Sequence, residues 1–181
     1  MTVRRHAALA DYSPWMPVVI GGINVLDEIH TSYNRSHVVK IVESIIETEA
    51  PVHKDRLARL VGGAFGLSRV SEDRKRAIQR VVPQEYTRAD DADFYWPTGT
   101  EPQTWRTVRV PETGESRPID EVSLVELGNA MVVVAEQSGG AMKDDLKRQA
   151  MALFGGVKRM GAAVTTRLDA ALERAVAVGG S

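Results

Sequence analysis

An internal repeat constrains the fold of this 181-residue chain more than any other feature of its sequence. Residues 54–66 align with residues 143–155 at an offset of 89 positions, and six of the 13 aligned pairs are identical. The identical pairs are Lys54 and Lys143, Asp55 and Asp144, Leu57 and Leu146, Arg59 and Arg148, Phe65 and Phe154, and Gly66 and Gly155. Such self-similarity indicates two copies of one supersecondary unit.

Each copy predicts three helices. Apolar residues recur four, seven and eight positions apart before each aligned segment, and four apart after it, which is the spacing of a one-faced helix. Capping residues agree, because Gly66 and Gly155 follow the second helices and Ser71 precedes the third helix of the first copy. The third helices of the two copies can be aligned in either of two registers that differ by about one helical turn, and the sequence does not choose between them. The predicted helices span 37–49, 54–65, 71–82, 123–137, 142–154 and 162–178.

Two short runs, Glu85–Arg88 and Phe94–Trp96, flank an acidic turn and are typical of a β-hairpin. Three helices and a hairpin, with a tight turn between the second and third helices, follow the order of a winged helix-turn-helix. The sequence thus predicts a mainly α fold with small β-hairpins, built from two tandem winged-helix-like three-helix units. The predicted segments are an irregular lead-in (1–36), a first winged-helix-like unit (37–97), a Pro/Gly-rich acidic connector (98–122) and a second winged-helix-like unit lacking a full wing (123–181).

Composition narrows the class of protein. A hydrophobic content of 43% with 26% charged residues is typical of a packed globular chain and excludes wholesale disorder. There are no cysteines, which removes disulfides and thiolate sites and favours a reducing compartment, so we expect a cytoplasmic protein. The longest apolar stretches are shorter than a spanning helix needs, and we expect no membrane partner.

Charge is segregated along the chain, although the formal net charge is only −1. Residues 53–82 carry eight basic and three acidic side chains, whereas residues 83–122 carry four basic and nine acidic ones. This pattern suits an anion-binding surface followed by an acidic connector. An alternative interpretation is that the two oppositely charged segments pair with each other.

Motifs for catalysis are missing from the sequence. No P-loop, dinucleotide-binding glycine fingerprint or nucleophile elbow occurs. Asp27, His30 and His37 cross a loop-to-helix junction without the paired spacing of metal ligands. We therefore expect no enzymatic activity, no catalytic residues, no cofactor and no metal site.

The third helix of the first copy is the candidate site. On a helical wheel Arg76 and Arg80 lie roughly 160° and 200° from Ile78, so both face away from the core. In a winged helix that outer face enters a DNA groove, where guanidinium groups suit phosphates and guanine edges. An ordinary solvated face is the alternative interpretation. The candidate nucleic-acid-binding residues are Arg69, Lys75, Arg76, Gln79 and Arg80.

Several short motifs together resemble a known family. They are Tyr12–Trp15, Glu47–His53, Arg56–Val61, Phe65–Val70, Phe94–Pro97, Arg117–Pro118, Gly128–Met131 and Phe154–Gly156. The combination resembles the uncharacterised C-terminal domain of large bacterial superfamily-one DNA helicases that also carry a very-short-patch-repair-like endonuclease domain. The resemblance implies an accessory module of a DNA-processing or defence system. Helicase and nuclease motifs are absent from this chain, so neither activity carries over.

Two functional hypotheses follow. The first is a non-catalytic DNA-binding module that uses the basic helix of the first unit. The second is a protein-interaction module that docks onto a helicase or endonuclease chain through the low-charge surface of the second unit. The segregated basic segment favours the first hypothesis, whereas the near-neutral total charge favours the second. The sequence leaves the oligomeric state open.

Overall fold

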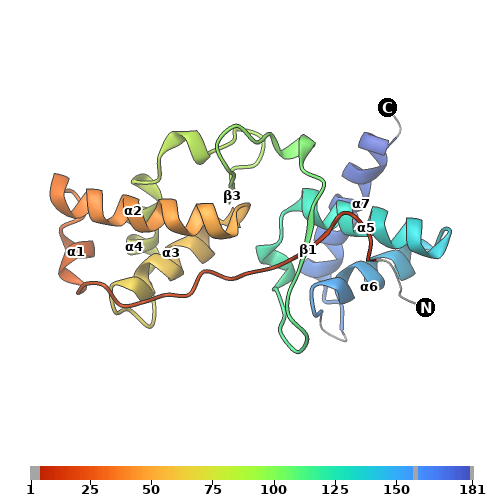
Figure 1. The fold of residues 1–181 in the computed structure, drawn as a ribbon, viewed down its shortest axis with the longest axis horizontal. Coiled ribbons are helices and arrows are strands. Elements are labelled where there is room, and N and C mark those ends of the chain that lie inside the picture. The colour runs from red at the N-terminus through yellow and green to blue at the C-terminus, as the bar shows by residue number, and fades with distance from the viewer. Residues whose placement is uncertain (1–4, 157–158, 180–181) are drawn as a thin grey trace. The chain divides into compact units, whose positions relative to one another are not determined.

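The computed structural model describes residues 5–156 and 159–179 (Figure 1). Within these residues the chain forms seven α-helices and four short strands, which confirms the mainly helical fold class with few strands. The chain divides into two compact units. The inserted unit is Ser13–Thr100, and the split unit combines Met1–Tyr12 with Glu101–Ser181. The inserted unit therefore interrupts the sequence of the split unit.

The inserted unit is built around α2 (Ser32–Glu49), α3 (Lys54–Ala64) and α4 (Glu72–Arg80), preceded by the short α1 (Asn24–Asp27). Side chains cap the start of all three longer helices, because Thr31, His53 and Ser71 accept hydrogen bonds from backbone N–H groups of the first turn. The apolar faces of these helices close one core, whose most buried members include Val38, Val42, Ile45, Leu57, Val61 and Ile78.

The split unit holds α5 (Leu124–Ser138), α6 (Lys143–Leu153) and α7 (Ala162–Gly179). Strand β1 (Leu9–Asp11) pairs in parallel with β4 (Val108–Val110), so residues 9–11 join the unit that α5 to α7 form. A separate core fills this unit, with Val108, Leu127, Met131, Phe154 and Leu168 among its buried side chains.

The six predicted helices coincide with α2 to α7, with bounds that differ by a few residues at most ends. The largest difference is at α2, which begins at Ser32 because Thr31 caps it. Glycines follow α3 and α6 as predicted, since Gly66 and Gly155 both adopt positive φ.

The predicted hairpin of Glu85–Arg88 with Phe94–Trp96 does not form as a strand pair among the described residues. Strand β3 (Phe94–Tyr95) instead pairs antiparallel with β2 (Val52–His53), which directly precedes α3, and Gln84–Tyr86 form a 3-10 helix. Arg88 connects the residues on either side of Phe94–Tyr95. Its guanidinium donates hydrogen bonds to the carbonyl oxygens of Glu85, Thr87, Pro97 and Thr100. One backbone hydrogen bond, from Trp96 N–H to the Tyr86 carbonyl oxygen at 2.9 Å, joins the two runs, and the Arg88 side chain supplies the further contacts.

Residues of the predicted lead-in and connector are incorporated into both units. The segment 13–36 belongs to the inserted unit and includes α1 and the start of α2. The segment 101–122 belongs to the split unit and contributes β4 and two 3-10 helices, Pro102–Thr104 and Ile119–Glu121. None of the helices in the described part of the chain is long and apolar enough to cross a membrane.

Candidate functional site

The cap at the start of α4 and the burial of one of its side chains position this helix. Ser71 caps its first turn, where Glu72 and Asp73 complement the helix dipole, and Arg80 lies in its last turn. Ile78 is buried in the core of the inserted unit. Burial of this one face leaves the opposite face of α4 to solvent.

Three of the five candidate residues are exposed. Arg76 and Arg80 lie on α4 and Arg69 lies in the turn that precedes it. Arg76 Nη2 is 2.7 Å from Asp73 Oδ1, and this hydrogen bond raises the pKa of Arg76 above its ordinary value. No hydrogen bond or ion pair within the described residues involves Arg69 or Arg80. Their guanidinium groups are available to an external anion.

The other two candidates are half-buried. Gln79 Nε2 donates a hydrogen bond to Asp55 Oδ1 of α3 at 3.2 Å. Lys75 Nζ lies 2.8 Å from Glu72 Oε1, and this contact raises the pKa of Lys75. Lys75 and Gln79 therefore make contacts within the unit, as Arg76 does with Asp73, but only the three arginines are exposed.

Acidic side chains neutralise part of the basic segment 53–82. Arg74 Nη2 is 2.6 Å from Asp27 Oδ1 of α1, and Lys54 Nζ is 2.6 Å from Asp93 Oδ1. The Lys54–Asp93 pair joins the basic segment to the acidic segment that follows it, which agrees with the alternative interpretation of the charge pattern. Arg69 and Arg80 remain exposed cations of this segment that lack an ion pair within the described residues.

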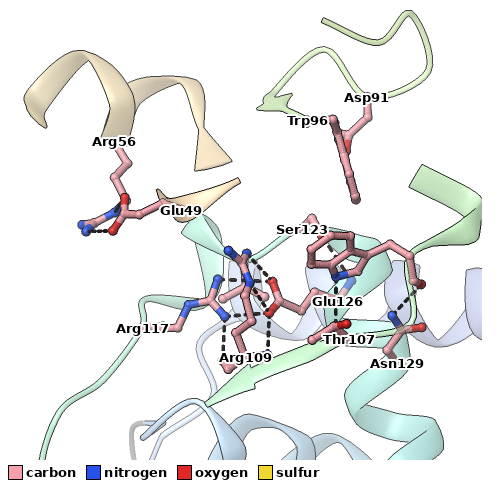
Figure 2. Close-up of polar contacts among 12 residues, drawn as sticks. Glu49, Arg56, Asp91, Trp96, Thr107, Arg109, Arg117, Ser123, Glu126 and Asn129 are labelled. Carbon is pink, nitrogen blue, oxygen red and sulfur yellow. Dashed lines mark hydrogen bonds and ion pairs between the residues drawn. The ribbon is translucent and has the colours of Figure 1, made fainter. Parts of the chain in front are cut away.

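Sequence reasoning missed a buried cluster of charges in the split unit (Figure 2). Glu126 of α5 is fully buried and contacts two buried arginines, Arg109 of β4 and Arg117. Glu126 Oε1 accepts hydrogen bonds from the backbone N–H of Arg109 at 2.8 Å and from Arg117 Nη1 at 2.8 Å. Glu126 Oε2 lies 2.9 Å from Arg109 Nη2.

Aromatic rings complete this cluster. Arg117 lies over the rings of Tyr12 and Phe154 at 4.3 and 5.5 Å from their centroids, and Arg109 lies 5.6 Å from the ring of Trp105. Burial alone would raise the pKa of Glu126, but the charges of the two arginines lower it to about 2. The carboxylate therefore stays ionised and ties β4 and the following loop to α5.

A second buried carboxylate joins three segments within the inserted unit. Glu49, at the end of α2, is buried and accepts hydrogen bonds from Arg56 Nη2 at 2.6 Å and from Arg56 Nε at 3.0 Å (Figure 2). The backbone N–H of Trp15 donates to the same carboxylate, and the indole N–H of Trp15 donates to Ser44 Oγ at 3.0 Å. This contact anchors the segment that enters the inserted unit.

These clusters assign a structural role to several motif residues. Tyr12, Arg117 and Phe154 meet around Glu126, and Trp15 and Arg56 meet around Glu49. A sequence signal existed, because Glu126 interrupts an otherwise apolar run of α5, but its arginine partners could not be identified from spacing. No group of three or more metal-ligating side chains occurs within the part of the chain that the structure describes.

Comparison with known proteins adds one finding. Residues 27–83 match a family described as a protein of unknown function, DUF3320. The matched segment runs from the last residue of α1 through α2, α3 and α4, and so includes the candidate helix. No curated protein and no solved structure shows significant similarity to the chain.

Proposed function

We propose that the chain is a non-catalytic DNA-binding module in which the inserted unit presents α4 to a duplex or to a fork. The observation that carries this proposal is the exposure of Arg76 and Arg80 on the face of α4 opposite the buried Ile78, with Arg69 exposed in the preceding turn. Guanidinium groups on one helical face suit contacts to phosphates and to guanine edges.

The order of elements supports the same proposal. A short turn joins α3 to α4, and β2 and β3 form a small sheet beside α3, an arrangement compatible with a winged-helix-like unit. In winged helices the last helix of the three contacts the major groove. The proposed contact residues are Arg69, Lys75, Arg76, Gln79 and Arg80. Two of them also make contacts within the unit, because Lys75 pairs with Glu72 of the same helix and Gln79 contacts Asp55 of α3.

The proposed setting is a helicase- or endonuclease-type DNA-processing or defence system in the bacterial cytoplasm. The motif resemblance supports this setting, and the family match covers only the segment that contains α2 to α4. A helicase or endonuclease reading frame next to the gene is the observation that would place the chain in such a system.

The test is DNA binding by the full chain as a function of salt. We expect labelled duplex and forked DNA to bind with an affinity that falls linearly with salt concentration on a log–log plot, as measured by fluorescence anisotropy. The double substitution Arg76→Ala and Arg80→Ala should weaken binding and make the slope shallower by about 1 to 2, because each lost phosphate contact contributes roughly 0.9. Protein stability should change by about 0.5 kcal/mol or less, because both side chains are exposed.

The matched control removes two exposed cations from α6 of the split unit, with Lys143→Ala and Arg148→Ala. It lowers the net charge by the same amount, so a general electrostatic effect would weaken binding equally in both variants. Thr166→Ala with Glu173→Ala is a second control on α7 and should leave binding almost unaltered. Absence of wild-type binding at low salt, or equal losses in the two charge variants, would contradict the proposal.

A further inference from the structure

The split unit carries an apolar groove that the proposed DNA contact does not use. Helices α5 and α7 lie side by side (Figure 1), and the groove between them has a volume of about 270 Å³. Leu124, Val125 and Val132 line it from α5, and Ala175 and Val178 line it from α7. Val132 and Val178 are 43% and 47% exposed, so both present apolar surface to solvent.

Among the described residues, the charged side chains that line this groove are cationic. Arg106 and Arg174 contribute two guanidinium groups, and the remaining polar lining consists of Gln103 and Asn129. Backbone carbonyls of Gln103 and Trp105 accept hydrogen bonds from Arg106 and orient it. Arg174 is half-buried, and none of the described residues forms a hydrogen bond or ion pair with it. A carboxylate from outside would supply the missing counter-charge.

The volume of the groove bears on the kind of ligand that it can bind. Sites that enclose a whole small-molecule ligand usually have a volume of about 300 to 1,000 Å³, and this groove lies just below that range. It suits the side chains of an amphipathic helix, which buries apolar residues three and four positions apart while the rest of the helix stays in solvent. Neighbouring acidic residues of that helix would reach Arg106 and Arg174.

We propose that the α5–α7 groove is a docking site for an amphipathic helix of a partner protein that carries carboxylates beside its apolar face. Apolar anchors of the partner contact Val132 and Val178, and its carboxylates pair with Arg106 and Arg174. This site lies in the split unit and does not depend on DNA binding by α4.

The test uses the full chain as bait for a displayed library of helical peptides with randomised surface positions. We expect the recovered peptides to combine Leu, Ile or Phe at helical spacing with Asp or Glu at adjacent positions. Their affinity should fall at least tenfold for Arg174→Glu and for Val132→Ser combined with Val178→Ser. Exchanging the acidic residues of a recovered peptide for Lys should restore binding to Arg174→Glu.

Arg148→Glu is the matched control, because Arg148 is an exposed cation of α6 in the same unit and outside the groove. It should leave peptide affinity unchanged, and thermal melts should show that every variant is folded. The proposal is overturned if no peptide is recovered, if recovered peptides lack carboxylates, or if the groove variants bind like the wild type. Dimerisation of the chain alone that is abolished by Val132→Ser and Val178→Ser would assign the groove to a second copy and also overturn it.

Discussion

Glu126 is the residue that joins the buried charges of the split unit. Its carboxylate contacts both Arg109 and Arg117, whose side chains are only 10% and 5% exposed. Taking a carboxylate away from buried cations is strongly destabilising, because the protein interior solvates charge poorly. The cluster therefore links three segments of the split unit through a single side chain.

Replacing Glu126 with Gln is predicted to destabilise the split unit by about 3 kcal/mol or more, because it removes the negative charge that both buried arginines contact. Urea unfolding of the full chain, followed by circular dichroism, measures the loss. Glu136→Gln is the matched control, since Glu136 is an exposed residue of α5 that contacts His6, and it should change stability by less than about 1 kcal/mol. Equal effects of the two substitutions would contradict the structural role of Glu126.

The same residue predicts how stability depends on pH. The pKa of Glu126 is lowered from 4.5 to about 2 in the folded chain. As the pH falls, the Glu126 carboxylate is therefore protonated in the unfolded chain before it is protonated in the folded chain. The contribution is fully present above pH 4.5 and is lost as the pH falls toward 2, by about 3 kcal/mol in total. The wild type should lose more stability in this range than Glu126→Gln, and parallel pH profiles would refute the assignment.

The two copies of the repeat have equivalent glycines, Gly66 after α3 and Gly155 after α6, and the surroundings of these two glycines differ. Gly66 and Gly155 have φ of 85° and 73°, a conformation that costs an L-residue roughly 1–2 kcal/mol. A Cβ at Gly66 would meet nothing within 4 Å, whereas a Cβ at Gly155 would lie 2.3 Å from the carbonyl oxygen of Glu115. The second contact involves backbone and cannot be relieved by rotating a side chain.

We therefore predict that Gly66→Ala costs about 1–2 kcal/mol and that Gly155→Ala costs about 3 kcal/mol or more. Unfolding midpoints of the two variants in urea provide the comparison, and each glycine serves as the control for the other. The loop 115–117 must move to accommodate the methyl group added at Gly155, although Arg117 N–H donates a hydrogen bond to the Phe154 carbonyl at 2.8 Å. Indistinguishable losses would show that this loop yields without cost.

The chain as a whole leaves one unit after Tyr12 and returns to it at Glu101. The inserted unit has its own core, whereas the split unit needs residues from both ends of the chain. Its strand β1 pairs with β4, and Arg117 lies over the ring of Tyr12. These contacts predict that the two units respond differently when the chain is cut.

The fragment 13–100 is predicted to melt cooperatively on its own. The fragment 101–181 should be less stable than the same fragment joined to residues 5–12 by a flexible linker, by about 2 kcal/mol or more, because it lacks the β1 pairing and the ring of Tyr12. Thermal melts and urea titrations of the three proteins test this. Equal stability of the linked and unlinked fragments would show that β1 contributes nothing to the split unit.

Much of the helical structure could be predicted because its causes are local. Apolar spacing identified α2 to α7, and Ser71, Gly66 and Gly155 marked helix ends through the geometry of their own backbones. The exposure of Arg76 and Arg80 also followed from helical periodicity about Ile78. The Lys75–Glu72 pair also follows from helical spacing, because its two residues are three positions apart on α4. The hydrogen bond from Gln79 to Asp55 joins two helices, and a helical wheel cannot show it.

The order of residues was thus sufficient to predict which segments are helical, where most of them begin and end, and which face of α4 meets solvent. Only the three-dimensional fold determines that Phe94–Tyr95 pairs with Val52–His53 rather than with the nearby run Glu85–Arg88. It also determines that Leu9–Asp11 pairs with Val108–Val110. It was also needed to bury Glu126 between Arg109 and Arg117. Helices depend on hydrogen bonds between residues four positions apart, whereas strand pairs and buried ion pairs depend on residues that only the folded chain brings together.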